Sequence, residues 1–149
     1  MRYFKNKKIS LAVQKHNLKI TYPKLIDKIF IKKGILHCYM RLQPSPNSDI
    51  YEIHIRYKIN ERPKVWVIYP KIEKLNGEYP IHKYGFDTSG NIELCVFCPE
   101  YKEWNDKNML LSETFIPWVV TWLHTYEFWL VTGIWNYKEK HPKLKKRKK

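Results

Sequence analysis

The chain has 149 residues, 44% of them hydrophobic and 15% aromatic, which is enough for one domain with a buried core and excludes disorder of the whole chain. Its formal charge of +14 is concentrated at the two ends. Residues 1–40 carry net +9 and residues 138–149 net +7, whereas residues 41–137 carry net −2. Because nucleic-acid-binding domains usually spread basic residues through their folded part, this distribution argues against such a domain.

The cysteines and the first residues indicate the compartment. Cys38, Cys95 and Cys98 form an odd set without the spacing of a secreted disulfide framework. Residues 1–8 lack the continuous apolar run of a signal peptide. We therefore expect a cytoplasmic protein.

The most hydrophobic run covers residues 115–131. It is shorter than the roughly 20 residues that a membrane-spanning helix needs, and it contains His124 and Glu127. The sequence therefore predicts a buried helix here and no association with a membrane.

The first predicted element is a helix over residues 9–19. It ends before Pro23, because proline disfavours a helical conformation in the residue before it. The apolar residues expected on its buried face are Ile9, Ala12, Val13 and Leu18.

Three strands are predicted next, over residues 35–43, 50–60 and 64–69. The second is the clearest, because apolar and polar residues alternate strictly along it. His54 falls on its polar face, where we expect the side chain to be solvated. The short turns between these strands favour an antiparallel meander over parallel strands joined by helices.

Residues 82–97 have extended character with turn residues, and residues 105–132 have helical spacing. Pro117 suits the first turn of a second helix or a kink, and Gly133 is a typical helix stop. One face of this helical region is predicted to carry Trp118, Trp122, Thr125 and Trp129.

This order of elements predicts an α+β fold, in which helices pack on one face or end of an antiparallel sheet. We expect a single domain over residues 1–137. Residues 138–149 form a basic tail that is predicted to be disordered and to contact acidic proteins or RNA.

The segment around Cys95 and Cys98 allows three interpretations. A zinc site would need two more ligands, and neither a second Cys-x-x-Cys nor a paired histidine motif supplies them. A redox pair would suit a strand that leads into a helix, although the antiparallel setting argues against it. The third interpretation is that Cys95 is a single nucleophile.

The order of short motifs between residues 50 and 104 resembles that of ubiquitin-conjugating enzymes. In that family a strand leads to a Val…Tyr-Pro stretch, a histidine motif, a glycine turn, the active cysteine between aliphatic residues, and a later tryptophan. The matching parts here are residues 65–70 (Val-Trp-Val-Ile-Tyr-Pro), His82, Gly90, Leu94-Cys95-Val96 and Trp104.

The resemblance implies a ubiquitin-conjugating-like fold with Cys95 as the thioester-forming nucleophile, and it implies no cofactor. The family's His-Pro-Asn is replaced by His82-Lys83-Tyr84, so the asparagine that supports the oxyanion or the attacking amine is absent. Its part would fall to Tyr84, His82, Asn91 or backbone N–H groups. The candidate catalytic residues are therefore Cys95, His82 and Tyr84.

The C-terminal part, with tryptophans up to Trp135 and then His141-Pro142, is similar to the conjugating-enzyme-like proteins of short type II CBASS operons. These are bacterial antiphage systems that signal through cyclic oligonucleotides. The similarity implies a cGAS/DncV-like nucleotidyltransferase as the protein partner. Its C-terminus would form the thioester and pass to an amine acceptor, without a separate activating enzyme.

Two other functions stay open. The protein could be a catalytically inert scaffold of the same fold that binds its partner noncovalently, which the missing asparagine favours. It could also be a nucleic-acid-binding module that uses its basic ends. At the level of single residues, His82 could be structural, Tyr84 could serve in packing, and Trp104 could anchor a loop.

Overall fold

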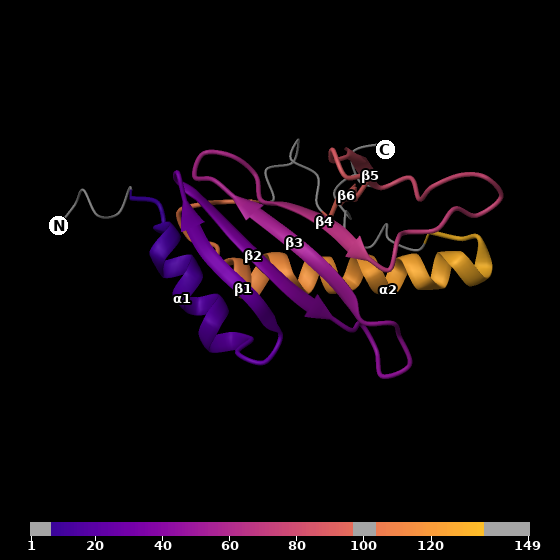
Figure 1. Cartoon of the computed structure of the whole chain (residues 1–149), viewed down its shortest axis with the longest axis horizontal. Coiled ribbons are helices and arrows are strands. Elements are labelled where there is room, and N and C mark those ends of the chain that lie inside the picture. Colours follow the sequence, from indigo (N-terminus) through magenta and orange to yellow (C-terminus); the bar gives the residue numbers. More distant parts are fainter. Residues whose placement is uncertain (1–6, 97–103, 136–149) are drawn as a thin grey trace, which may run out of the picture.

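The computed structural model describes residues 7–96 and 104–135, which form a sheet with helices on one side (Figure 1). The elements of the described residues are α1 (Leu11–Thr21), β1 (Ile26–Lys32), β2 (Ile35–Leu42), β3 (Tyr51–Tyr57), β4 (Lys64–Tyr69), β5 (Lys83–Phe86), β6 (Ile92–Leu94), the π-helical turn η3 (Leu111–Phe115) and α2 (Ile116–Thr132). The strands pair antiparallel in the order β1-β2-β3-β4-β6-β5.

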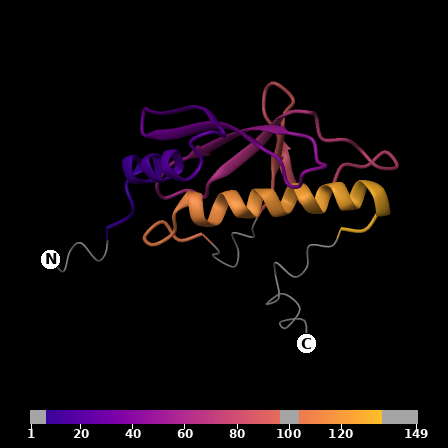
Figure 2. The same ribbon diagram turned by 90° about the horizontal axis from the view of Figure 1, so that it is seen from below.

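The alternating strands place their apolar residues on the inner face of the sheet. Tyr51, Ile53, Ile55 and Tyr57 of β3 are all buried, as the sequence predicts. α2 crosses this inner face, and α1 lies beside β1 (Figure 2). The predicted α+β fold with helices packed on one side of an antiparallel meander is thus confirmed.

α2 follows η3 directly and has Pro117 in its first turn, in agreement with the first of the two expectations for this proline. Gly133 ends the helix in the left-handed region at φ +79°, which glycine adopts without strain. Trp122 is fully buried, whereas Trp118 and Trp129 are half-buried against the core. The buried side of α2 is formed by Ile116, Val119, Trp122, Leu123, Thr125 and Tyr126.

The buried face of α1 differs from the predicted one. Gln14 and Leu18 are buried, whereas Val13 is 45% exposed. Gln14 tolerates burial because both ends of its amide are bonded: Nε2 donates to the Met109 carbonyl at 3.0 Å, and Oε1 accepts from the Leu111 N–H at 2.8 Å. A polar side chain therefore joins α1 to the start of η3.

Two further parts of the fold differ from expectation. The sequence pattern does not predict β1, because Ile29, Phe30 and Ile31 follow one another without alternating with polar residues. The register is also irregular between Ile26 and Lys28. Residues 105–110 form turns instead of the predicted helix, which begins only at Leu111.

The outer face of the sheet carries a cluster of rings from β1, β2 and β3. Tyr39 stacks on His54 with ring centres 4.2 Å apart, and Phe30 stacks on His37 at 4.9 Å. Nδ1 of His37 and Nε2 of His54 lie 3.0 Å apart, so one imidazole donates a hydrogen bond to the other. The expectation that His54 is solvated is therefore wrong, since its ring is half-buried in this cluster.

Among the helices of residues 7–96 and 104–135, none is both long and apolar enough to cross a membrane. The predicted basic tail, residues 138–149, lies outside the described residues, and so does Cys98.

Candidate active site

Strand β6 places Cys95 on the outer face of the sheet. Ile92 and Leu94 are buried in the core, so the alternate residues Glu93 and Cys95 lie on the opposite side. The thiol of Cys95 is half-buried, whereas the thiol of Cys38 is fully buried. Of these two cysteines, Cys95 is the one that a protein substrate can approach.

Pairing of β5 with β6 brings the other predicted site residues beside Cys95. Lys83 pairs with Leu94, and the backbone N–H of Cys95 donates to the carbonyl oxygen of His82 at 3.1 Å. His82, Tyr84 and Cys95 therefore belong to one structural unit, as expected from their order in the sequence.

The turn between β5 and β6 engages Asn91. Its backbone N–H and its Nδ2 donate to the Asp87 carboxylate at 2.8 and 3.0 Å, and its Oδ1 accepts from Lys71 Nζ at 2.6 Å. Asn91 thus holds the turn that aligns the two strands. With both ends of its amide bonded there, Asn91 is a poor replacement for the missing asparagine.

The side chain of Tyr84 forms a hydrogen bond with the side chain of Cys95. A tyrosine phenol is protonated at neutral pH, and burial, and then this hydrogen bond, raises the pKa of Tyr84 further above its ordinary value. A protonated phenol can donate to a thiolate or to an oxyanion that develops next to it. Tyr84 is therefore the best-placed donor among the candidate residues.

Arg62 and Glu93 support the ring of Tyr84. Cζ of Arg62 lies 3.9 Å from the centre of that ring, and Nη1 of Arg62 donates to Oε2 of Glu93 at 2.8 Å. Arg62 follows β3 in the turn before β4, so this contact depends on the order of strands in the sheet. Sequence motifs do not predict either residue, although alternation along β6 could have placed Glu93 on the same face as Cys95.

The backbone carbonyl of His82 accepts two hydrogen bonds. Its carbonyl oxygen accepts from Trp122 Nε1 at 2.8 Å as well as from the N–H of Cys95. The centre of its imidazole ring lies 5.5 Å from that of Trp135. Because Trp122 belongs to the core of α2, His82 connects the segment of Cys95 to that helix.

Trp104 anchors the chain to β3 at the start of the second described part. Its Nε1 donates to the hydroxyl of Tyr57 at 3.3 Å, and the two rings pack edge to face with centres 5.5 Å apart. These contacts agree with the loop-anchoring interpretation of Trp104.

Within residues 7–96 and 104–135, no three His, Cys, Asp or Glu side chains gather closely enough to hold a metal ion. The zinc and redox interpretations both need Cys98, which the described residues do not include.

Comparison with protein families shows which family the chain is similar to. Residues 14–142 match the model of the Type II CBASS E2 protein family. No curated protein matches the chain. The matched region contains the whole sheet, Cys95 and α2.

Proposed function

Because the chain belongs to the Type II CBASS E2 protein family, with a role in CBASS antiphage defence, we propose that it is a thioester-forming transferase with Cys95 as its nucleophile. Its acyl donor is the C-terminus of a cGAS/DncV-like nucleotidyltransferase, and its acceptor is an amine. The observation that supports this proposal is the half-buried Cys95 thiol hydrogen-bonded to Tyr84 on the outer face of the sheet.

The proposed reaction has two acyl transfers. In the first, the Cys95 thiolate attacks the C-terminal carbonyl of the partner after a nucleoside triphosphate has activated it as an acyl phosphate or acyl adenylate. A C–S bond forms, the C–O bond to the activating group breaks, and phosphate or the nucleoside monophosphate leaves. In the second, an amine attacks the thioester carbonyl, so a C–N bond forms and the Cys95 thiolate leaves. The amine loses a proton in this step, and the carbonyl oxygen carries negative charge in the transition state.

Tyr84 takes the role of the oxyanion donor in this proposal, since its hydroxyl is protonated and adjacent to the sulfur. Arg62 is a positioning residue, because it holds the Tyr84 ring and touches no reacting atom. His82 also acts by positioning, through the carbonyl oxygen that binds the N–H of Cys95.

The test is a conjugation assay in cells that express the operon and are challenged with phage. We expect Cys95→Ala to abolish both the partner's conjugate and protection, while Cys38→Ala, a matched loss of a thiol, preserves both. Conjugation that survives Cys95→Ala but is lost in Cys98→Ala would show that Cys98, and not Cys95, is the nucleophile.

A noncovalent scaffold is the second candidate function, and the substitution of the family's asparagine motif by His82-Lys83-Tyr84 favours it. The two functions are distinguished by measuring phage protection in cells whose Cys95→Ala protein still binds the partner. A scaffold retains protection there, whereas a transferase loses it.

A further inference from the structure

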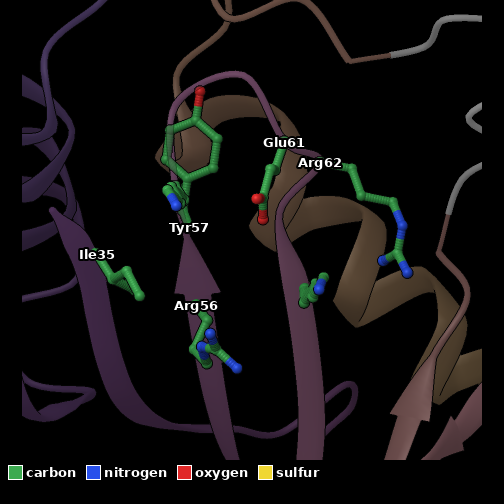
Figure 3. Close-up of a pocket in the computed structure, with 7 residues that line it drawn as sticks. Ile35, Arg56, Tyr57, Glu61 and Arg62 are labelled. Carbon is green, nitrogen blue, oxygen red and sulfur yellow. The ribbon is translucent and has the colours of Figure 1, made fainter.

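A shallow, solvent-open hollow lies between the end of β3 and the start of β4, on the outer face away from the helices (Figure 3). We call it the basic hollow, because four of its lining side chains are cationic and one is acidic. The side chains that line it are those of Ile35, Arg56, Tyr57, Lys58, Glu61, Arg62 and Lys64.

Arg56 carries a buried donor without an acceptor in the basic hollow. Within the described part of the chain, its Nε is buried and forms no hydrogen bond. The guanidinium group instead lies 5.7 Å from the centre of the Trp66 ring. Buried donors are nearly always satisfied in folded proteins, so this one calls for a ligand or another explanation.

The pairing of strands places like charges next to each other at the same point. Arg56 on β3 lies directly opposite Lys64 on β4. Like charges opposite each other on adjacent strands are destabilising. Such an arrangement is typical of a site where an anion compensates the repulsion.

Nearby carboxylates do not compensate these cations. Glu93 binds Arg62 at 2.8 Å, and Asp27 binds Arg41 at 3.0 Å elsewhere on the outer face. Among the described residues, neither Arg56 nor Lys64 forms a salt bridge. Of the side chains that line the hollow, Glu61 is the acidic one, and its single negative charge is outnumbered by the positive charges of Arg56, Lys58 and Lys64.

We propose that the basic hollow binds a phosphate group. The planar guanidinium of Arg56 suits the paired oxygens of a phosphate, and Lys58 and Lys64 supply point charges on either side. The excess of positive charge over Glu61 fits a doubly charged group. Aromatic stacking on a base is not part of this site, because the aromatic ring that lines the hollow, that of Tyr57, is buried and packs against Trp104.

Replacement of Glu61 is expected to increase the affinity for phosphate, which tests the proposal. Its carboxylate extends from the turn after β3 between the two strands (Figure 3). It therefore repels a phosphate bound in the hollow. Removing that charge should strengthen phosphate binding, whereas a merely structural cluster would show no binding to strengthen.

The experiment measures binding of inorganic pyrophosphate by calorimetry and of a short fluorescent oligothymidylate by anisotropy, with the full chain at about 0.15 M salt. We expect Arg56→Gln to weaken binding about tenfold, and Glu61→Gln to strengthen it. The matched control is Arg41→Gln, which removes the same charge from the same face but from a residue already paired with Asp27. This control should change the affinity less than twofold.

The two ligands distinguish the source of the phosphate. Binding of pyrophosphate assigns the site to a free phosphate compound, and binding of the oligonucleotide alone assigns it to a nucleic-acid backbone. In the second case, Arg56→Gln should also reduce the salt slope of the affinity by about 0.7, the value for one phosphate contact on a single strand.

Three results would overturn the proposal. The first is that neither ligand binds to the wild-type chain. The second is that Arg56→Gln and Arg41→Gln lose the same amount of binding affinity, and the third is that Arg56→Gln leaves the affinity unchanged. If Arg56→Gln does not fold, as judged by thermal melting, Lys64→Gln replaces it with the same expectations. Cys95 is not involved in the site, so these results do not depend on the proposed transferase activity.

Discussion

Tyr84 is the side chain whose chemistry differs most from that of the conjugating-enzyme motif. An asparagine amide is replaced by a phenol, which is protonated at neutral pH and whose pKa burial raises further. The Arg62 guanidinium lies 3.9 Å from the centre of this ring and favours its position beside Cys95. A single strong donor fixed in this way can take over the stabilisation of an oxyanion.

Replacement of this donor should therefore slow transfer to the amine. We predict that Tyr84→Phe lowers the rate of aminolysis by about 100-fold, which is the usual effect of losing one oxyanion donor. Single-turnover discharge of the Cys95 thioester measures this rate. Tyr39→Phe, a matched loss of a phenol on the same face of the sheet, should leave it unchanged, and an equal loss in both variants would contradict the role of Tyr84.

The two described cysteines should differ in reactivity. Burial, with a smaller contribution from Asp27, raises the pKa of Cys38 to about 12, so almost no thiolate forms there near neutral pH. We predict that iodoacetamide at about pH 8 modifies Cys95 and spares Cys38 until the protein unfolds. Peptide mass spectrometry with and without urea measures the extent of labelling at each cysteine. Labelling of Cys38 in the native protein as fast as that of Cys95 would contradict the prediction.

At the scale of elements, the two histidines connect β2 and β3 on the outer face. Burial, and then the positive charges of His37 and Arg56, lowers the pKa of His54 to about 4. The pKa of His37 is lowered as well, first by burial and then by Arg56 and Lys32. Both rings are therefore neutral in the folded protein at neutral pH.

Acid should weaken the fold through His54. The unfolded chain has a histidine pKa of about 6.5, so between about pH 6.5 and pH 4 the unfolded state binds a proton that the folded state does not. The free energy of unfolding should fall over this range by on the order of 3 kcal/mol. Urea titrations at several pH values measure this fall, which His54→Gln should reduce. The exposed His16→Gln is the control, and the same fall in both variants would assign it to other groups.

Gln14 should be the most sensitive contact between α1 and η3. Gln14→Met keeps a similar volume but leaves the Leu111 N–H and the Met109 carbonyl without their partner. We predict a loss of about 2 kcal/mol or more in the free energy of unfolding. Asn17→Ala removes an exposed side-chain bond to the Val13 carbonyl and should cost less than about 0.5 kcal/mol. Similar midpoints in urea for the two variants would show that the buried amide is dispensable.

How much of each element could be predicted depends on whether its pattern is local. β3 alternates strictly, so the buried Ile53 and Ile55 follow from the sequence alone. The same reasoning fails for α1, because the burial of Gln14 depends on partners near residue 110, far along the chain. It also fails for β1, where three apolar residues in a row, Ile29 to Ile31, lack the alternation on which the prediction depends.

The candidate site shows the same limit. Cys95, His82 and Tyr84 lie within one hairpin, so motif spacing predicts their proximity. Arg62 reaches Tyr84 only because β6 inserts between β4 and β5 in the sheet, an order that differs from the order in the chain. Contacts of that kind depend on tertiary topology and leave no local pattern in the sequence.

For the whole molecule, the two faces of the sheet differ in role: one packs against the helices and the other carries the candidate sites. Both α-helices of the described residues lie on one side and enclose the core (Figure 2). The opposite side carries Cys95, Tyr84, the histidine pair and the basic hollow. The charge distribution takes on a new meaning here, because the central residues are slightly acidic in total and yet gather cations at Arg56 and Lys64.

The central claim is that Cys95 carries the partner's acyl group, and a trapped adduct tests it most directly. Cys95→Ser should turn the labile thioester into a more stable oxygen ester with the nucleotidyltransferase C-terminus. Intact-mass and peptide mass spectrometry of the complex should then locate this ester at position 95, and the corresponding wild-type adduct should be lost on treatment with a thiol reductant. An adduct on another residue would contradict the account. So would a stable noncovalent complex in which neither the wild-type protein nor Cys95→Ser carries an adduct.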